Sequence, residues 1–574
     1  MRLSWLKLEG LRFDAETLRH DLLAGVTVSL VAVPQSLAYA QLAGVPAYYG
    51  LYAAFVPTIV GAVFGSSRQL STGPVAMTSL LTAASVAPFA LRGTESFYTQ
   101  VILLALLSGV FQIAFGLFRA GVLLNFLSFP VLMGFINAAA LIIGLSQLPT
   151  LLGIPSRQSE HFLADTWQVL TNIDTTHAVS LGFGCSAFVL LVAFRRFAPK
   201  LPGVLLTVAV LTWVSGVIGY AQMGGRVVGT VPQGLPTVAI PKMDWNMIVA
   251  LLPASFVIAV ISFMEAMSSA KVIAIKTRQP WDENRELIAQ GLAKVAAAFV
   301  QSMPVSGSFS RSALNLASNA KTGLSSVISA CAVLLTLLFF TSLLYNLPKP
   351  VLAAIIIMAV VGLINFPALR GAWRASRDDG IAAVATFVAT LAFAPNIQNG
   401  IITGIMLSLG LMLYRLMRPR VALLGFHADG VLRDARRFGL PPLHPQLGAI
   451  RFDGSLHFIN ASFFEDALLQ LERDTPNLRY VLVTCGGIND LDASGVEVLG
   501  KLVERFRSNG IELTFSSLKK QVLDVMDRSG LTEQIGRHNI FPTDAHALEQ
   551  LRERLHEHGS KIQGVARASV PTAG

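Results

Sequence analysis

The sequence predicts a polytopic α-helical membrane protein with a small α/β domain at its C-terminal end. Of the 574 residues, 53% are hydrophobic and only 14% are charged. In soluble domains about a quarter of all residues are charged. Apolar runs dominate from about Asp21 to Leu416, and an ordinary soluble composition follows from about Arg418. The net charge of +10 comes from basic residues in short loops between apolar runs, which indicates membrane topology and no nucleic-acid binding.

Composition divides the chain into five predicted segments. They are a cytoplasmic N-terminal segment 1–20, a transmembrane domain 21–417, a linker 418–440, a soluble domain 441–560 and a disordered tail 561–574. The N-terminal segment is too charged for a signal peptide, so we expect the first span to direct insertion. The cysteines Cys185, Cys331 and Cys485 are far apart and match no metal spacing. We therefore expect no disulfide framework, no metal and no cofactor.

Fourteen apolar runs are candidate spans. They lie near 21–41, 50–65, 73–90, 98–117, 121–148, 177–195, 201–220, 247–275, 284–301, 308–319, 323–345, 350–364, 380–395 and 397–416. The third and the tenth are short and occupy corresponding places in two sets of seven. Paired interrupted segments of this kind indicate two inverted repeats with a binding site between them. An odd number of spans in each half gives the halves opposite orientations.

Basic residues support one topology. With the N-terminus inside, every predicted cytoplasmic loop carries Lys or Arg. The longest predicted outside loop, 148–177, has only Arg157 against three acidic residues. This distribution follows the positive-inside rule. We therefore predict a multi-pass protein of the inner (plasma) membrane, with the lipid bilayer as its surroundings and both termini in the cytoplasm.

The segment Met303–Leu316 interrupts the apolar pattern deep in the chain. It is rich in Gly and Ser, and it carries the cation Arg311. Pro304–Phe309 breaks the helical pattern, and a short helix begins near Ser310. Non-helical backbone persists in a membrane only where protein buries it or where it lines a wet cavity. The start of this helix offers free N–H groups, the positive end of the helix dipole and a guanidinium in the first turn. Together these features predict an anion site.

The third span opens with a similar break. Gly73 interrupts the chain, Pro74 suits the first position of a helix, and Leu70–Thr72 has strand propensity. We expect a short extended piece that leads into a half-helix starting near the membrane midplane. The alternative is an ordinary helix start at the membrane surface. The predicted anion ligands are backbone N–H groups near Val75, Ala76, Phe309 and Ser310, together with the Arg311 side chain.

Two other spans contain polar residues that are costly in a membrane. Gln35 and Tyr39 lie four residues apart on one face of the first span, where they either line the site or connect helices. Glu265 follows at least ten residues without charge in the eighth span. Hydrocarbon and a nearby cation act oppositely on its carboxyl group, so it can exchange a proton during a transport cycle. The alternative is a structural ion pair with Arg311.

The run from Ala47 to Arg68 contains Tyr49-Gly50-Leu51-Tyr52 and Gly65-Ser66-Ser67-Arg68, and PQSLAYAQLAGVP precedes it. These motifs, with FMEAMSSAKVIAIK, NRELIAQGLAK and SGSFSRSALN, resemble the sulfate permease (SulP) family of anion transporters. The resemblance implies fourteen spans in a seven-plus-seven inverted repeat, split into core and gate subdomains, and a homodimer. It also implies Glu265 as the coupling carboxylate and Arg311 as the anion-binding cation.

Three positions depart from the family pattern. Gly61 stands where Tyr or Ile is usual, Lys294 where Asn is usual, and Asn319 where Gly is usual. Lys294 lies about ten residues into the ninth span. It either reaches toward the membrane surface or pairs with an acidic group that the sequence does not identify.

The C-terminal domain alternates strand and helix patterns and resembles a STAS domain, which the family carries at this end. We predict strands at Ala449–Phe452, Leu456–Phe458, Tyr480–Cys485 and Ile511–Ser516, and helices near 494–509, 518–529 and 543–557. In the motif INDLDASG, Ser494 corresponds to a Ser that is phosphorylated in related bacterial regulators. The alternative is a capping box in which Ser494 and Glu497 start a helix. A cytoplasmic protein is an expected partner of this domain.

These features favour a secondary transporter of a small inorganic oxyanion, with sulfate as the first candidate. We expect H+ as the coupling ion and keep Na+ as an alternative, because Ser268 and Ser269 near Glu265 offer oxygen ligands. The remaining alternatives are a dicarboxylate or sodium-coupled bicarbonate symporter, and an anion channel or membrane sensor that signals through the C-terminal domain. We predict that the protein is not an enzyme, because the sequence has no nucleophile–base constellation.

Overall fold

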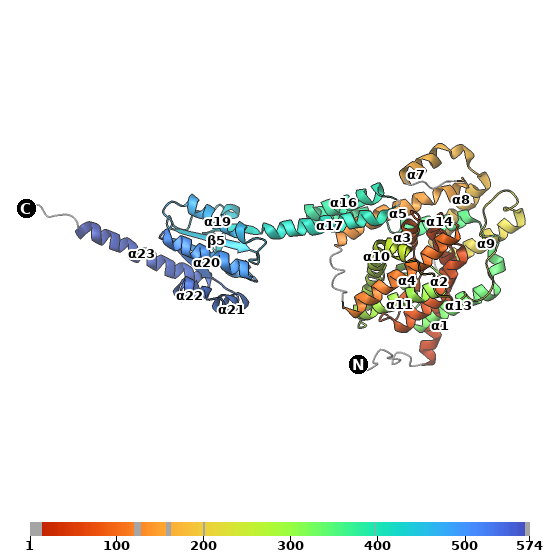
Figure 1. Ribbon diagram of the computed structural model, residues 1–574, viewed down its shortest axis with the longest axis horizontal. Coiled ribbons are helices and arrows are strands. Elements are labelled where there is room, and N and C mark those ends of the chain that lie inside the picture. Colours follow the sequence, from red (N-terminus) through yellow and green to blue (C-terminus); the bar gives the residue numbers. More distant parts are fainter. Residues whose placement is uncertain (1–13, 120–127, 156–161, 199–200, 395, 569–574) are drawn as a thin grey trace, which may run out of the picture. The chain divides into compact units, whose positions relative to one another are not determined.

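The computed structural model describes residues 14–119, 128–155, 162–198, 201–394 and 396–568. The chain forms two compact units, Met1–Ser408 and Leu409–Gly574, which Figure 1 shows with their helices and strands labelled. Residues 1–13, most of the predicted N-terminal segment, lie outside the described residues. We describe each unit by itself.

Each of the fourteen predicted apolar runs contains a helix in the structure, and residues 121–127 of the fifth run lie outside the described residues. The helices are α1 (Ala15–Ala43), α2 (Ala47–Phe64), α3 (Ala76–Val86), α4 (Glu95–Leu117), α5 (Phe129–Ser146), α8 (Ala178–Phe197), α9 (Gly203–Ile218), α10 (Trp245–Thr277), α11 (Glu283–Phe299), α12 (Phe309–Ala317), α13 (Leu324–Phe339), α14 (Lys349–Val361), α16 (Arg377–Ala392) and α17 (Ile397–Met417). Among the described residues, three further α-helices lie between them: α6 (Leu148–Leu152), α7 (Phe162–Thr171) and α15 (Phe366–Ala375).

Spans three and ten are interrupted, as their length and composition predict. Strand β1 (Ser71–Gly73) precedes α3, and strand β2 (Ser306–Ser308) precedes α12. The two strands pair antiparallel, with Ser71 opposite Ser308 and Gly73 opposite Ser306. Antiparallel pairing makes the two half-helices enter from opposite directions, which two inverted repeats require. Their N-termini therefore start from one shared two-stranded element.

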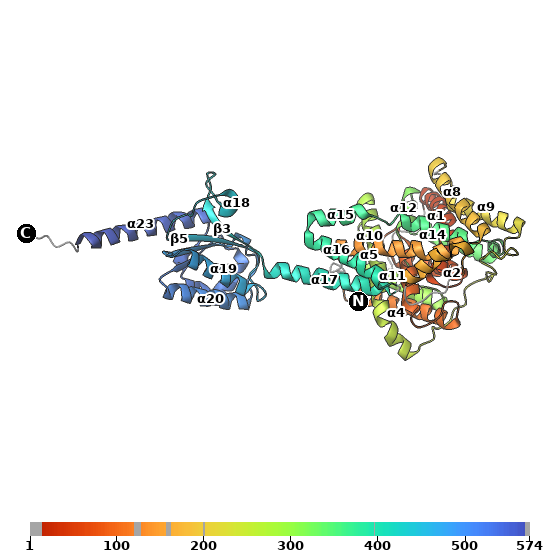
Figure 2. The same ribbon diagram turned by 90° about the horizontal axis from the view of Figure 1, so that it is seen from above.

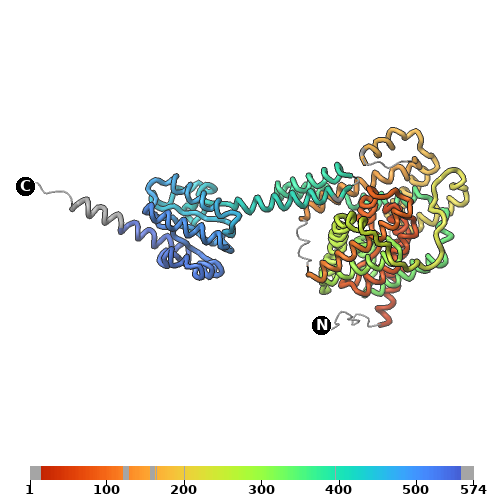
Figure 3. Tube along the Cα trace, in the orientation of Figure 1, coloured from red at the N-terminus to blue at the C-terminus, as the bar shows by residue number. Residues whose placement is uncertain are grey.

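The helices of the first unit pack in two groups. In one group, α4 contacts α10 and α11, while α1 and α2 contact each other and α13. In the other group, α5, α8, α9, α14, α15 and α16 contact one another. Figure 3 shows the yellow-green α11 alongside the orange α4. Helix α1 contacts α9 and α14, so it connects the two groups. This grouping corresponds to the expected core and gate subdomains.

The C-terminal unit is a layered α/β domain. Its six-stranded sheet has the order β4-β3-β5-β6-β7-β8. Pairings from β5 to β8 are parallel, whereas β3 is antiparallel to both β4 and β5. The strands are β3 (Arg420–Phe426), β4 (Leu432–Asp434), β5 (Leu447–Asp453), β6 (Tyr480–Thr484), β7 (Glu512–Ser516) and β8 (Ile540–Phe541).

Helices cover both faces of this sheet, as Figure 2 shows for α19 and α20 on one face and α23 on the other. Two hydrophobic clusters fill the spaces between sheet and helices, one containing Phe452, Phe464 and Phe506 and the other containing Leu482 and Leu551. The helices are α18 (Ala435–Phe438), α19 (Ala461–Asp474), α20 (Ala493–Ser508), α21 (Lys520–Arg528), α22 (Leu531–Ile535) and α23 (Asp544–Ala568).

Three predictions about the bounds and strands of this unit are wrong. Residues 418–440 are not a linker, because β3 and β4 form one edge of the sheet there. The run VALLGF directly follows a membrane helix and is bounded by polar residues, which hides its strand character in the sequence. Leu456–Phe458 is not a strand, since only Leu456 forms an isolated bridge, with Leu491. Helix α23 extends to Ala568, into the segment predicted as a disordered tail, and residues 569–574 lie outside the described residues.

Candidate anion-binding site

Arg311 lies in the first turn of α12 and is almost fully buried, with 2% of its surface exposed. Ser308 caps this helix, and its Oγ accepts a hydrogen bond from the Arg311 backbone N–H at 3.4 Å. The guanidinium reaches the other broken span, where Nη1 donates to the Pro74 carbonyl oxygen at 2.8 Å. Its Nη2 is buried and has no hydrogen-bond partner among the described residues. One face of the cation therefore remains available to an acceptor.

The start of α3 lies beside this guanidinium. Val75 is its extended N-cap residue and Ala76 its first helical residue, and both are buried. The first N–H groups of any helix have no partner within that helix. Phe309 and Ser310 open α12 with exposed side chains, so their backbone is the part suited to an anion. The antiparallel β1–β2 pairing joins the two broken spans, with α3 following Gly73 at one end of the pair and α12 following Ser308 at the other.

A glycine allows the guanidinium to approach β1 so closely. A Cβ atom on Gly73 would lie 2.9 Å from Nη2 of Arg311, closer than real Cβ contacts allow. Any other residue at position 73 would displace the guanidinium. The Gly-Pro pair is thus needed for the position of the cation as well as for interrupting the helix.

The predicted carboxyl group and the residues of the first span lie near the same cation. Glu265 on α10 is close enough to Arg311 for their charges to interact, and Tyr39 on α1 interacts with both. Tyr39 and Gln35 are buried, with 5% and 8% of their surfaces exposed. Oε2 of Glu265 and Oε1 of Gln35 are buried atoms without a hydrogen-bond partner among the described residues. Helix α1 contacts both half-helices, α3 and α12. Its buried residues Gln35 and Tyr39 therefore come from a helix that packs against both broken spans.

Lys294 does not reach toward the membrane surface. It is completely buried on α11, and its Nζ donates a hydrogen bond to Ser262 Oγ on α10. Its charge interacts with that of Glu265, which is the acidic group that the sequence did not identify. Lys294 therefore belongs to the electrostatic surroundings of the site. Of the two serines considered as sodium ligands, Ser268 is exposed and Ser269 is buried.

A second buried carboxylate, that of Glu286, binds the loop before β1 and was not predicted from the sequence. Glu286 Oε2 accepts hydrogen bonds from the backbone N–H groups of Ser66 and Ser67, at 2.8 and 3.1 Å. Gln290 donates to Oε1 of Glu286 at 3.0 Å and to Thr72 Oγ1 at 2.8 Å. This network connects the loop before β1 to α11. The signal was available, since Glu286 and Gln290 stand four apart in NRELIAQ.

Comparison with known proteins identifies the family of this chain. The Sulfate permease family matches residues 18–386, and the STAS domain matches residues 442–547. The chain belongs to the sulfate permease family. Probable sulfate transporter 4.2 of Arabidopsis thaliana is 34% identical over 541 residues, covering 91% of this chain and 79% of that relative. A probable sulfate transporter of Mycobacterium tuberculosis is 31% identical over 545 residues, covering 94% of this chain and 97% of that relative.

Solved structures show the same fold. The structure of SLC26A9 superposes with a TM-score of 0.84 at 21% identity, covering 97% of this chain and 93% of that one. The transmembrane domain of the cyanobacterial bicarbonate transporter BicA superposes with a TM-score of 0.58 at 23% identity, covering 68% and 98%. This sulfate permease family member is therefore a polytopic helical membrane protein with a C-terminal STAS domain. The relatives are named as transporters, which agrees with the prediction that the chain is not an enzyme.

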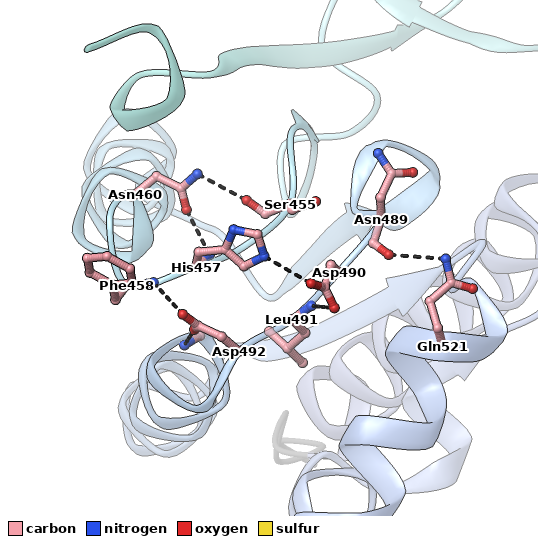
Figure 4. A network of polar contacts seen from close by, with 10 residues as sticks. Ser455, His457, Phe458, Asn460, Asn489, Asp490, Leu491, Asp492 and Gln521 are labelled. Carbon is pink, nitrogen blue, oxygen red and sulfur yellow. Dashed lines mark hydrogen bonds and ion pairs between the residues drawn. The ribbon is translucent and has the colours of Figure 1, made fainter. Parts of the chain in front are cut away.

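In the STAS domain the alternative interpretation of Ser494, as the start of a capping box, is wrong. Helix α20 starts at Ala493, and Asp492 is its N-cap, with Oδ1 accepting from the Gly495 N–H at 2.8 Å. The other oxygen, Oδ2, accepts from the Phe458 N–H at 2.8 Å, as Figure 4 shows. Asp492 is the N-cap residue because its two carboxylate oxygens accept hydrogen bonds from two different chain segments. Ser494 is the second helical residue, partly buried, and Glu497 pairs instead with Lys501 at 2.6 Å.

His457 directly precedes Phe458, and its Nε2 lies 3.2 Å from Asp490 Oδ2 (Figure 4). Neither this pair nor Ser494 belongs to the unit that contains Arg311. Cys485, the last residue of the predicted strand 480–485, lies just after β6 and is buried. Burial raises the pKa of the Cys485 thiol, so the thiol stays protonated and serves packing.

Proposed function

We propose that this protein is a secondary active transporter that takes up sulfate together with a proton. The observation that carries the proposal is the buried guanidinium of Arg311, which comes from the first turn of α12 and donates a hydrogen bond to Pro74, just before α3. Two positive dipole ends and a cation with an unpaired N–H group suit a small oxyanion. The names of the two relatives above support sulfate as the cargo.

The proposed anion position lies between the starts of α3 and α12. Backbone N–H groups near Val75–Ala76 and Phe309–Ser310 would donate to it, and Nη2 of Arg311 would complete its coordination. Gln35 and Tyr39 would close the site from α1, where both are buried. Movement of the first helix group against the second would then expose the site alternately to the two sides of the membrane.

Glu265 is the proposed coupling group. An ionised carboxylate near a bound dianion would repel it by several kcal/mol, taking about 4–6 Å and an effective dielectric constant near 20. Protonation of Glu265 removes this repulsion, so the anion and a proton bind together. In the empty site the ionised carboxylate interacts favourably with Arg311.

The same proposal covers features that lie beyond the site. The basic cytoplasmic loops support a plasma-membrane protein with both termini in the cytoplasm. Family resemblance supports a homodimer. Ser494, at the partly buried start of α20, is the proposed regulatory position of the STAS domain, and a cytoplasmic protein is its proposed partner.

Uptake of labelled sulfate into proteoliposomes tests the proposal. With an imposed inward proton gradient we expect accumulation, and with a sodium gradient alone we expect none. Arg311→Ala should lower uptake about a hundredfold, because it removes a charge-assisted contact from a buried site. Glu265→Gln should abolish stimulation by the proton gradient while sulfate–sulfate exchange continues.

Glu283→Gln is the matched control for the carboxyl substitution. Glu283 begins α11 and pairs with Lys271 at 3.5 Å, with 38% of its side chain exposed, so uptake should stay within about twofold of wild type. Competition by fumarate or bicarbonate that exceeds competition by sulfate would point to a dicarboxylate or bicarbonate transporter. Unchanged flux in Glu265→Gln would instead indicate a channel, and sodium-driven accumulation would replace the proton as coupling ion.

A further inference from the structure

Lys294 is a buried cation that the mechanism above does not use. Its side chain has no exposed area, and its Nζ donates to Ser262 Oγ. Ser262 is held from a third helix, because Gln112 Nε2 on α4 donates to the same Oγ at 3.1 Å. A Cβ on Gly109 of α4 would lie 3.0 Å from the Lys294 Cβ, so α4 and α11 pack closely at this point. The hydrogen bond to Ser262 places the ammonium group against α10.

The contact with Ser262 places Lys294 next to the coupling carboxyl group. Ser262 and Glu265 are three residues apart on α10, so they share one face of that helix. The charges of Lys294 and Glu265 interact, and Arg311 interacts with Glu265 from α12. Glu265 thus lies among two cations and the Tyr39 hydroxyl group on α1.

No other acidic group lies close to Lys294 among the described residues of the elements that pack against α11. The elements with the most extensive contacts to α11 are α2, α4, α10 and β2. Helix α2 and strand β2 contain no charged residue, and the one acidic residue of α4, Glu95, is its first residue, remote in sequence from Gly109 and Gln112. On α10, Glu265 is the one acidic residue. On α11 itself, Glu283 and Glu286 lie eleven and eight residues before Lys294, so Glu265 is the acidic partner of Lys294.

We propose that Lys294 and Glu265 act as one proton-binding pair that adds a positive charge to the loaded site and thereby selects divalent over monovalent oxyanions. This inference rests on the proposed function. Lys294 donates its hydrogen bond to Ser262, which is not a predicted anion ligand, so we treat it as a positioning residue that acts through Glu265.

Charge counting gives the selectivity. With one proton, the pair is neutral whether the proton is on the amine or on the carboxyl group. A second proton gives the pair one positive charge, and Arg311 supplies another, so the loaded site balances a dianion. With a neutral residue at position 294, protonated Glu265 leaves only the charge of Arg311, which balances a monoanion. Uncompensated charge is costly in a buried site.

The test compares sulfate with perchlorate, which has the same tetrahedral shape and one negative charge less. In proteoliposomes with wild-type protein, perchlorate should compete weakly against labelled sulfate uptake. In Lys294→Gln, whose amide can still donate to Ser262, competition by perchlorate relative to unlabelled sulfate should strengthen about tenfold. The pH of half-maximal uptake should rise by about one unit, because a lone carboxyl group takes up a proton more readily than one beside an ammonium group.

Ser262→Ala is the control, because it removes the hydrogen bond and keeps the charge. It should leave the selectivity ratio within about threefold of wild type. If Lys294→Gln loses flux altogether, binding of the two anions is compared instead. The measurement is the rise in melting temperature that sulfate and perchlorate each produce in detergent. A wild-type protein that accumulates no sulfate would refute the proposed function. A sulfate-transporting wild type with a Lys294→Gln variant of equal selectivity and pH profile would refute this inference alone.

Discussion

At residue scale, the cation depends on the absence of a single side chain. The guanidinium of Arg311 passes Gly73 so closely that a Cβ there would lie 2.9 Å from Nη2. The atom in conflict is the far end of a flexible side chain, which moves at low cost. Substitution at Gly73 should therefore affect the position of the charge more than the stability of the fold.

Gly73→Ala tests this separation of function from stability. The KM for sulfate should rise about tenfold, because the displaced guanidinium no longer faces both half-helix N-termini. The melting temperature in detergent should change little. Gly144→Ala is the matched control, because a Cβ at Gly144 meets nothing within 4 Å. Equal KM values for both variants would show that the contact at Gly73 is unimportant.

At the scale of elements, the two-stranded β1–β2 piece is too short to be stable by itself. Its position depends on polar contacts with neighbouring helices. Thr58 Oγ1 donates to the Thr72 carbonyl at 2.8 Å, and Ser312 Oγ accepts from the Ser71 N–H at 2.8 Å. Glu286 holds the preceding loop through two backbone N–H groups. The site is therefore rigid because helices α2, α11 and α12 all bind this piece.

Glu286→Gln tests the contribution of the buried carboxylate. An amide cannot accept two charge-assisted hydrogen bonds as a carboxylate does, so the loop should lose about 2–3 kcal/mol of stabilisation. We expect a melting temperature several degrees lower in detergent and reduced sulfate uptake. Glu283→Gln, three residues earlier and partly exposed, should change neither. If the Glu286→Gln protein is as stable and active as wild type, the hydrogen bonds of Glu286 do not stabilise the loop before β1.

At the scale of the whole molecule, the C-terminal unit is complete only with the strands that follow α17 directly. Ala422 and Leu424 of β3 are 2% and 5% exposed and belong to the cluster between the sheet and α23. Strand β3 also covers the edge of β5. The domain thus begins at about Arg420, earlier than the family match at residue 442.

Two soluble fragments test this boundary. Residues 418–568 should give a cooperative thermal transition and dispersed amide NMR signals. Residues 441–568 should unfold at lower temperature or aggregate, because β5 becomes an open edge and burial of Leu424 alone contributes about 2 kcal/mol. Equal stability of the two fragments would show that β3 and β4 are dispensable additions.

Several features could be predicted from sequence because their causes are local. Hydropathy alone locates the fourteen helices, and the Gly-Pro and Gly-Ser interruptions locate the breaks before α3 and α12. A charge inside an apolar run, as at Arg311 or Glu265, is informative wherever the chain folds. Whether these residues bind sulfate and a proton stays a prediction.

Other features were decided by tertiary structure, because they join residues distant in the chain. The pairing of Ser71 with Ser308 and the hydrogen bond from Lys294 to Ser262 each depend on helix packing that no local pattern encodes. Asp492 caps α20 because it also bonds Phe458, which only the folded loop brings near. The sequence by itself determined which residues are costly to bury in this membrane protein. Only the packed helices decided which partners offset that cost.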